Sequence, residues 1–312
     1  MMDERCPTCE ARDWTTLFES RGYRIGRCKS CGLVRTLGVV PEGETEYPPF
    51  EQSETALVRA LRFGVAQLLR ERARFVEKVA PGKRLLDVGC GSGSFARLAS
   101  SRGFDAVGVE PFSLGREVDE PRLRLVRGKL EKLAPTLGRF DVITMWHVLE
   151  HLDDPIPALE TLLTLLEPGG IAVISVPNFA SWQSRVFEGG WFHLDPPRHI
   201  NHFVEGTLRE LLGRFGLEVF EERTFHFEYG PVGWLQSGIN RILPRKNFLF
   251  EFIKDRGALA DMPGALVAAN LAASAALAGV LAAPATVVEA IASRFDAGSV
   301  VTVAVRRRGD AR

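Results

Sequence analysis

A glycine-rich turn is the segment of this sequence whose residue types and spacing point most directly to chemistry. The turn contains Gly89, Cys90, Gly91 and Gly93. It follows the apolar stretch 84–88, in which Asp87 stands two positions before the first glycine. Because glycine has no Cβ, a ligand can approach such a turn closely and meet the N–H groups that open the next helix. A nicotinamide dinucleotide turn would have its last glycine where Ser94 stands, so the spacing argues against that cofactor.

Three later segments lie where the next strands of a parallel sheet would end. Glu110 closes the short apolar strand 105–109, where a carboxylate can accept hydrogen bonds from a ribose diol. Residues 140–152 form a strand that leads into a histidine-bearing turn, and residues 166–178 place a Pro-Gly-Gly turn before another apolar strand. This succession resembles the class I S-adenosylmethionine (SAM) methyltransferases, and the resemblance covers residues 81 to about 230.

The resemblance implies SAM as the methyl donor and assigns a set of residues to it. Those residues are Asp87, Gly89, Cys90, Gly91, Gly93, Glu110, Pro111, Phe112, Gly128, Leu130, Met145 and Trp146. Glu110 is expected to hold the ribose, while Pro111 and Phe112 would pack on the adenine. A tight strand-to-helix turn without any ligand is the alternative interpretation of the glycines alone.

Histidines follow the fourth and fifth expected strands, where a doubly wound sheet binds its ligands. His147 and His151 are four residues apart, which predicts that both lie on one helix face. The loop 191–203 contains Asp-Pro-Pro-Arg198-His199 and resembles a loop of a bacterial methyltransferase group. We expect His199 to act as general base and Arg198 to orient an anionic or carbonyl group, with His147 and His151 as further catalytic candidates.

Two alternatives apply to the 191–203 loop. Its polar groups can serve only to hydrogen-bond the backbone. A less favoured hypothesis is a metal ion bound by His193, Asp195, His199 and His202.

Four cysteines near the N-terminus form two C-x-x-C pairs. They are Cys6, Cys9, Cys28 and Cys31. This spacing is typical of a zinc ribbon, in which four thiolates close a tetrahedral site and leave no open position for a substrate. We therefore expect a structural Zn²⁺ that holds a segment too short to build its own core. Disulfides are the alternative, disfavoured in a reducing compartment.

The whole-chain composition bounds the function. The chain has 312 residues, a formal net charge of +0 and 46 % hydrophobic residues. A neutral chain lacks the broad positive surface of a nucleic-acid-binding protein, so nucleic acid is not an expected partner. Polar residues at the start predict that there is no signal peptide and that the protein is cytoplasmic.

The order of segments predicts an α/β protein with a doubly wound, seven-stranded Rossmann-like sheet. We expect a zinc ribbon over residues 1–40, a linker and helical lead over 41–80, and the SAM-binding core over 81–230. An apolar helical insertion would occupy 231–297, and 298–312 would supply the final strand of the core. The expected strands are 84–88, 105–109, 123–126, 140–145, 171–176, 217–227 and 299–305.

The expected insertion contains an unusually apolar run. Between Asp261 and Glu289 there is no charged residue, and residues 264–283 are rich in Ala, Leu and Val. A single membrane crossing is excluded, because the last strand must return to the sheet. Residues 262–285 are therefore expected to pack on the sheet or in a homodimer interface, to contact a membrane surface peripherally, or to span a membrane as a hairpin.

The sequence favours a SAM-dependent enzyme that O-methylates a small or lipid-linked acceptor, with a histidine as base. The zinc ribbon beside a methyltransferase core also resembles sugar C-methyltransferases, which act on nucleotide-linked sugars. A zinc-ribbon-guided RNA methyltransferase and a non-catalytic SAM-binding partner protein are the remaining alternatives.

Overall fold

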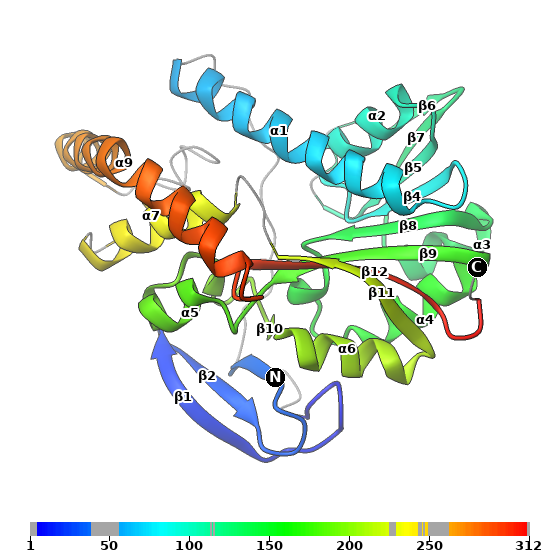
Figure 1. The fold of residues 1–312 in the computed structure, drawn as a ribbon, viewed down its shortest axis with the longest axis horizontal. Helices are drawn as coiled ribbons and strands as arrows, with labels where there is room; N and C mark the ends of the chain where they lie inside the picture. The colour runs from blue at the N-terminus through cyan, green and yellow to red at the C-terminus, as the bar shows by residue number, and fades with distance from the viewer. Residues whose placement is uncertain are drawn as a thin grey trace.

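The protein is described by a computed structural model. It describes residues 5–38, 56–112, 114, 116–224, 229–242, 245, 247–248 and 262–310. Residues 41–55, the linker part of the expected 41–80 segment, therefore lie outside the described residues. A large sheet lies on one side of the molecule, a small antiparallel sheet lies at its edge, and two helices of the insertion lie opposite (Figure 1).

The large sheet has eight strands in the order β11-β12-β9-β8-β4-β5-β7-β6. Its strands are β4 (Arg84–Val88), β5 (Asp105–Glu110), β6 (Val118–Glu120), β7 (Leu123–Arg127), β8 (Phe140–Trp146), β9 (Leu166–Pro177), β11 (Leu217–Arg223) and β12 (Val300–Arg307). The five neighbouring strands β9, β8, β4, β5 and β7 pair in parallel. Strand β12 runs antiparallel between β9 and β11. The doubly wound fold and the seven expected strands are confirmed, but β11 ends at Arg223, and residues 225–227 of the expected strand 217–227 lie outside the described residues. The short edge strand β6 is an addition.

Helices cover both faces of the large sheet. One face carries α1 (Ala56–Val79) and α2 (Ser94–Ser101), and the other carries α3 (Leu130–Leu137), α4 (Ile156–Leu165) and α6 (Glu205–Arg214). Successive strand residues point to opposite faces, so Leu85 packs with α1 and α2 while Leu86 packs with the other layer. Both strand faces are buried, which explains the continuous apolar runs of these strands.

The small sheet joins the N-terminal segment to the core. Its strands are β1 (Trp14–Ser20), β2 (Tyr23–Cys28), β3 (Val34–Leu37) and β10 (Asn201–His202). The two-residue strand β10 belongs to the loop after β9 and pairs antiparallel with β3, opposite Arg35 and Val34. The sheet of the expected ribbon is therefore completed by a strand from the loop of the core.

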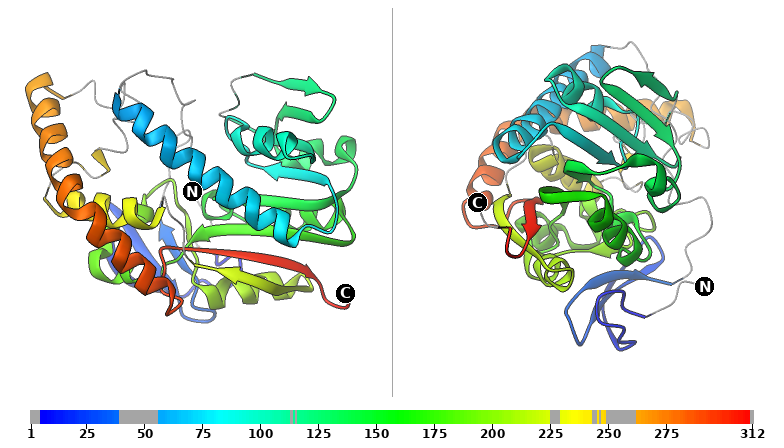
Figure 2. Two further views of the ribbon diagram at one scale, coloured as in Figure 1. Left: turned by 45° about the horizontal axis from the view of Figure 1, so that its top comes forward. Right: turned by 90° about the vertical axis from the view of Figure 1, so that its right-hand side faces the viewer.

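The insertion before β12 contains the helices α7 (Tyr229–Ile242) and α9 (Gly264–Ser293), which pack on one another (Figure 2). Within α9 the polar residues Asn270, Ser274 and Glu289 are buried, whereas Leu266, Val280 and Val287 are exposed. The apolar run is thus not buried in the core. No single helix among the described residues is long and apolar enough to cross a membrane, although two parts of α9, bent by 52°, together reach the required length and composition.

Short elements connect β9 to α6 and build the loop that carries the histidines. They are α5 (Trp182–Phe187) and the 3₁₀ turns η2 (Glu188–Gly190) and η3 (Phe192–Leu194), and a further 3₁₀ turn, η1 (Leu149–His151), follows β8. These elements lie at the carboxyl ends of the central strands, where a doubly wound sheet places its ligand site.

Candidate active site

The glycine turn has the close-approach geometry that the sequence predicts. Gly89 and Gly93 have φ values of +68° and +78°, in the left-handed region that favours glycine. A Cβ on Gly89 would lie 2.6 Å from Cγ2 of Val148, and one on Gly93 would lie 2.4 Å from Cδ1 of Leu125. The turn is therefore packed directly against the histidine-bearing turn after β8.

Glu110 holds the glycine turn in place. Its Oε2 accepts a hydrogen bond from the Gly91 N–H at 2.9 Å, and its Oε1 accepts one from the Phe112 N–H at 2.9 Å. A carboxylate has about four acceptor positions. Glu110 therefore fixes the backbone on both sides of the site with a group of the kind that binds a diol.

Asp87 lies beneath the turn and is 2 % exposed. Its Oδ1 accepts a hydrogen bond from the Thr144 hydroxyl at 2.8 Å. Burial raises the pKa of Asp87 to about 7, against the opposing effects of Thr144 and the Arg72 cation. Its charge thus depends on what binds next to it.

The last two residues of β8 point to opposite faces. Trp146 lies on the α1 face, with its ring 5.4 Å from that of Phe95, whereas Met145 is fully buried in the core of the other face. The indole Nε1 of Trp146 is buried and has no hydrogen-bond partner among the described residues. The two expected cofactor residues Met145 and Trp146 therefore lie on opposite faces of the sheet.

Arg72 of α1 is a site residue that the sequence analysis missed. Its guanidinium carbon lies 4.8 Å above the Trp146 ring, and its charge acts on Asp87, His147 and Glu150. The sequence does contain a signal for Arg72, because it is a cation between Leu68 and Phe75 on the apolar stripe of α1. Helical spacing places that cation on the face that packs against the sheet.

The other expected cofactor residues divide by exposure. Phe112 is 47 % exposed and can offer a ring face, and Pro111 beside it is half-buried. Leu130 is buried in the core, and Gly128 packs on Leu133. A Cβ on Gly108 would lie 2.8 Å from the Cys90 sulfur, so the half-buried Cys90 packs against β5.

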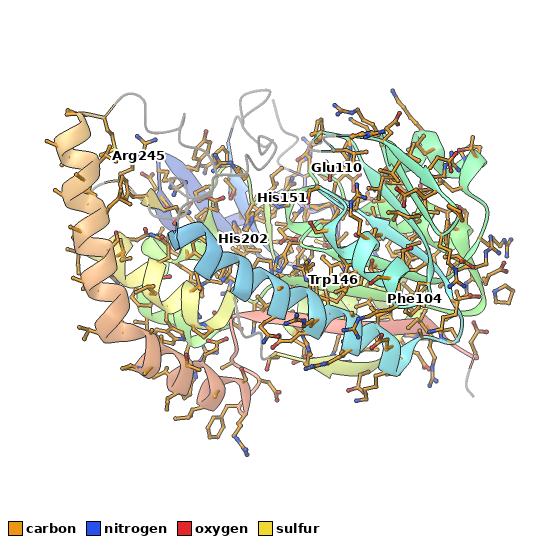
Figure 3. All side chains as sticks on the ribbon, turned by 90° about the horizontal axis from the view of Figure 1, so that it is seen from above. Phe104, Glu110, Trp146, His151, His202 and Arg245 are labelled. Atoms are coloured by element: carbon orange, nitrogen blue, oxygen red, sulfur yellow. The ribbon has the colours of Figure 1, made fainter. Side chains whose placement is uncertain are left out.

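The turn after β8 differs from the expected helix. His147 has a φ of +57° and precedes the three-residue 3₁₀ turn η1, so His147 and His151 do not share a helix face. The reason is local: Nδ1 of His147 bonds Oε1 of Glu150 at 2.9 Å and closes the turn. His151 instead directs Nδ1 to the Arg198 carbonyl at 2.9 Å. Figure 3 shows His151 in the central part of the molecule with Glu110 and Trp146.

His199 is brought against this turn by the loop after β9. Its ring lies 4.7 Å from that of His151 in an edge-to-face arrangement, and its Nδ1 bonds the His193 carbonyl at 2.7 Å. A carbonyl only accepts, so Nδ1 carries the proton and Nε2 is the basic nitrogen of the neutral ring. His202 in the same loop bonds Oγ1 of Thr36 through Nε2 at 3.0 Å.

Burial sets the charge of these groups. It lowers the pKa of His147 to about 3, of His151 to about 4 and of His202 to about 3, so these rings are neutral at pH 7. Burial also lowers the pKa of His199, but Glu150 and Asp195 act in the opposite direction. The pKa of Glu150 is raised by burial. The same two carboxyl groups also act to raise the pKa of His151, so they favour a proton on either ring of this pair.

Arg198 and Asp195 anchor the loop. Asp195 is 6 % exposed, and its Oδ2 lies 3.5 Å from Nη1 of Arg198. Its Oδ1 accepts hydrogen bonds from Arg21 and from Asn247, each at 3.0 Å. Asn247 of the insertion is another residue that sequence reasoning missed, and no local pattern marks it.

The four expected metal ligands are gathered at one point. Sulfur–sulfur distances are 3.5 Å for Cys6–Cys31 and 3.5 Å for Cys9–Cys28, and all four sulfurs lie within 4.8 Å of one another. A disulfide needs about 2.05 Å, so these thiols are not bonded to one another. Tetrahedral Zn²⁺ with Zn–S bonds of about 2.3 Å separates its sulfurs by about 3.8 Å, which this arrangement fits.

A family model described as "Methyltransferase domain" matches residues 59–222, which is more than half of the chain. The chain belongs to this methyltransferase family. The matched region contains the glycine turn, Glu110, the two histidines of the turn after β8 and His199.

Curated relatives match parts of the methyltransferase. An enzyme of Psychrobacter arcticus named ubiquinone biosynthesis O-methyltransferase is 37 % identical over 107 residues, which cover 31 % of this chain and 42 % of the relative. The enzyme of the same name from Cereibacter sphaeroides is 29 % identical over 177 residues, covering 52 % of this chain and 70 % of the relative. The chain thus spans less than half of the length of the first relative.

Solved structures are similar to the methyltransferase at low identity. A SAM-dependent methyltransferase of Mesorhizobium loti has a TM-score of 0.45 at 18 % identity, covering 77 % of this chain and 98 % of that one. Magnesium protoporphyrin IX methyltransferase of Synechocystis PCC 6803 has a TM-score of 0.44 at 17 % identity, covering 57 % and 85 %. Both TM-scores are below 0.5, so family membership rests on the sequence match.

The residues present in this methyltransferase fit SAM. The glycine turn leaves no room for a Cβ at Gly89 or Gly93, and the Glu110 carboxylate, which suits a diol, is fixed beside it by the Gly91 N–H. Asp87 supplies a carboxyl group whose ionised form a cationic ligand would favour. Donor and acceptor would meet between this turn and the His151–His199 pair.

Proposed function

We propose that the enzyme O-methylates a small or lipid-linked acceptor by in-line transfer, with His199 as general base. The observation that carries this proposal is the hydrogen bond from His199 Nδ1 to the His193 carbonyl, which leaves Nε2 as the proton acceptor. Glu150 and Asp195 both favour the imidazolium that results. An acceptor hydroxyl held between His199 and the glycine turn would lose its proton there.

The proposed step is a direct substitution at the methyl carbon. SAM supplies a methyl group already activated by the sulfonium. The acceptor oxygen forms a bond to that carbon while the carbon–sulfur bond breaks and its electron pair stays on sulfur. His199 takes the hydroxyl proton, and Arg198 orients a carbonyl or anionic group of the acceptor. The glycine turn and Glu110 hold the donor still, which lowers the entropic part of the barrier.

The curated relatives support this reaction class loosely. Their name, ubiquinone biosynthesis O-methyltransferase, specifies methyl transfer to oxygen, and their matches cover 31 % and 52 % of this chain. We extend the O-methyl chemistry to this chain because its own polar loop supplies a base.

A product assay tests the proposal. The zinc-loaded enzyme is incubated with labelled SAM and a panel of phenols, alcohols and lipid-linked hydroxyl compounds, and the product is analysed by NMR. We expect an O-methyl product and a fall in kcat of at least about 100-fold in His199→Gln, with unchanged SAM affinity. Glu160→Gln, on the exposed side of α4, is the control. A C-methyl product, methylated tRNA, or full activity of His199→Gln would contradict the proposal.

We further propose that α9 contacts a membrane surface. Its outward residues Leu266, Val280 and Val287 are 48 %, 73 % and 59 % exposed, and no residue from 262 to 288 is charged. Its polar residues Asn270 and Glu289 face inward instead. An apolar face turned outward is what burial in a headgroup layer requires, and it would place the enzyme beside a lipid-linked acceptor.

Liposome flotation tests the membrane contact. Wild-type protein is expected to float with phosphatidylcholine–phosphatidylglycerol vesicles, whereas the double variant Val280→Glu/Val287→Glu is expected to stay in the dense fraction. Circular dichroism checks that the variant is folded. A wild-type protein that does not float but sediments as a dimer, dissociated by the same two substitutions, would contradict the membrane proposal in favour of a homodimer.

The Cys6, Cys9, Cys28 and Cys31 cluster is proposed to hold a structural Zn²⁺. Four thiolates would complete the coordination shell, so the ion would take no substrate. Its role would be to fix the small sheet, which contacts the histidine loop through β10. Metal analysis of purified protein is expected to yield one zinc per chain, and a Cys9→Ser variant is expected to lose it.

A further inference from the structure

Thr36 of the small sheet is hydrogen-bonded to the loop that carries His199. It lies in β3, and its side chain is fully buried. Its Oγ1 donates a hydrogen bond to the His199 carbonyl at 2.7 Å, and its backbone N–H donates one to the Ile200 carbonyl at 2.9 Å. The N-terminal segment is therefore bonded to the proposed base and to the residue that follows it.

The two contacts of the Thr36 hydroxyl fix the position of its proton. Besides the His199 carbonyl, Oγ1 has Nε2 of His202 at 3.0 Å. A hydroxyl has one proton and a carbonyl can only accept, so the proton points to His199. Oγ1 must then accept from His202, which places the proton of that neutral ring on Nε2. One hydroxyl thus connects β3 to two side-chain-bearing positions of the loop.

The turn after β8 holds the same part of the loop from another direction. The Ile200 N–H donates to the Glu150 carbonyl at 2.7 Å. This N–H and the His199 carbonyl belong to one peptide group, which is rigid and planar. Two hydrogen bonds at its opposite ends therefore restrict both its place and its tilt. We call the Thr36 hydroxyl, the 199–200 peptide group and the Glu150 carbonyl the peptide clamp.

The other bonds of His199 lie within its own loop. Its N–H donates to the Asp195 carbonyl at 3.1 Å, and its Nδ1 donates to the His193 carbonyl at 2.7 Å. These bonds fix the ring relative to the loop. They do not by themselves fix the ring relative to the sheet that would hold the methyl donor. The peptide clamp supplies this second restraint.

We propose that Thr36 is a positioning residue for the base, so that the small sheet completes the active site. The inference rests on the proposed role of His199. Proton transfer requires the base within hydrogen-bond reach of the acceptor hydroxyl, and a displacement of about 1 Å can lower a rate about 100-fold. The Thr36 hydroxyl acts through His199, by keeping its Nε2 at the place from which it can take the proton.

Two substitutions at Thr36 separate positioning from simple packing. Thr36→Val keeps the volume and the branched shape but removes the hydroxyl. Thr36→Ser keeps the hydroxyl but removes the buried methyl group. A residue that only fills space would tolerate valine better than serine, whereas a positioning hydroxyl would tolerate serine better than valine. Thr16→Val, at an exposed position of β1 in the same sheet, is the matched control.

Kinetics of the zinc-loaded full chain provide the first measurement. Rates are determined with labelled SAM and whichever compound of the panel of phenols, alcohols and lipid-linked hydroxyl compounds the wild-type enzyme methylates. Thr36→Val is expected to lower kcat at least about tenfold with unchanged SAM affinity, because only the base is displaced. Thr36→Ser and Thr16→Val are expected to keep kcat within about twofold of wild type.

NMR of protein labelled with ¹⁵N at histidine provides a second measurement that needs no acceptor. Long-range ¹H–¹⁵N spectra report which ring nitrogen carries the proton, and His199→Gln and His202→Gln assign the signals. Wild type and Thr36→Ser are expected to show a sharp His199 ring signal protonated at Nδ1 and a His202 ring protonated at Nε2. In Thr36→Val the His199 signal is expected to broaden or split.

The outcomes separate the peptide clamp from the proposed function. Equal kcat in Thr36→Val and Thr16→Val, or a larger loss in Thr36→Ser than in Thr36→Val, would overturn the clamp and leave His199 as base. If Thr36→Val does not fold, protonation of wild-type His202 at Nδ1 would overturn the clamp, and protonation at Nε2 with an active Thr36→Ser would support it.

Two further outcomes concern the proposed function itself. Full activity of His199→Gln would overturn the base and the positioning role of Thr36 together. If no compound of the panel is methylated, the proposed acceptor classes are wrong and the NMR comparison decides on the clamp. An unchanged His199 signal in Thr36→Val would then overturn the clamp, and a broadened or split signal would support it.

Discussion

Arg21 of the small sheet donates a hydrogen bond from Nη1 to Oδ1 of Asp195 at 3.0 Å, joining the N-terminal segment to the histidine loop. Asp195 is 6 % exposed and has a φ of +32°. The same oxygen also accepts from Asn247 of the insertion at 3.0 Å. One buried carboxylate therefore links three segments that are far apart in the sequence, and it sits three residues before Arg198 in the loop.

Replacing Arg21 with methionine is expected to destabilise the protein by about 1–3 kcal/mol, because it leaves the Asp195 charge buried with fewer donors. The loop should loosen, so kcat should fall while SAM affinity stays unchanged. Denaturant unfolding and SAM titration measure the two effects. Arg27→Met, at an exposed position of β2, is the control. Equal stability of the two variants would show that the pair does not hold the loop.

Removing the ribbon metal is expected to release the histidine loop. The pairing of β3 with β10 and the bond from the Thr36 hydroxyl to the His199 carbonyl at 2.7 Å both depend on an ordered small sheet. In a Cys9→Ser variant, hydrogen exchange should accelerate in residues 195–203 and remain slow in β4 and β8. Equal hydrogen-exchange protection of residues 195–203 in wild type and Cys9→Ser would show that the loop is ordered without the metal.

The substitution Gly89→Ala is expected to weaken SAM binding at least about tenfold. The new Cβ would lie 2.6 Å from the Val148 side chain, and the φ of +68° strains any residue with a Cβ. Gly206→Ala on α6 is the matched control, since its Cβ would meet nothing within 4 Å. That change should leave binding intact and stabilise the helix by up to about 1 kcal/mol. Calorimetric titration with SAM compares the two variants. Equal SAM affinities would show that the glycine turn does not contribute to SAM binding.

SAM affinity is expected to fall as the pH is lowered from 8 to 6. Burial raises the pKa of Asp87 to about 7, so the carboxyl becomes protonated in this range and loses its attraction for a cationic ligand. The loss should be about tenfold at one pH unit below the pKa. Asp87→Asn should bind SAM weakly and lack this component. Parallel pH profiles for wild type and variant would contradict the assignment.

The Asp87 carboxyl also affects the stability of the protein without SAM. Here the pH dependence has the opposite sign, because stability falls as the pH rises. Its pKa is raised from 3.8 to about 7 on folding, so the folded state binds the proton more tightly than the unfolded state. Its contribution to stability is full below pH 3.8 and is lost as the pH rises through about 7. Asp87→Asn should therefore gain stability relative to wild type between pH 6 and 8 in denaturant unfolding.

Local signals in the sequence determined the order of the strands, the glycine turn, the carboxylate at Glu110 and the cysteine pairs. Each of these depends on neighbouring residues: glycine at a positive φ, apolar runs that need burial on both faces, and C-x-x-C spacing. The sequence also placed His199 and His151 at the correct end of the sheet. The chemistry of short segments is therefore enough to recognise the family and most of the candidate site.

Tertiary packing alone decided how these parts meet. Contacts between distant segments place the Arg72 cation above Trp146 and pair β10 with the small sheet. The sequence likewise did not predict the 3₁₀ turn that separates His147 from His151. No periodicity marks such contacts, because they depend on which side chains fill the space between elements. For the same reason, only the fold reveals that the apolar residues of α9 face outward and that the Thr36 hydroxyl contacts the His199 carbonyl.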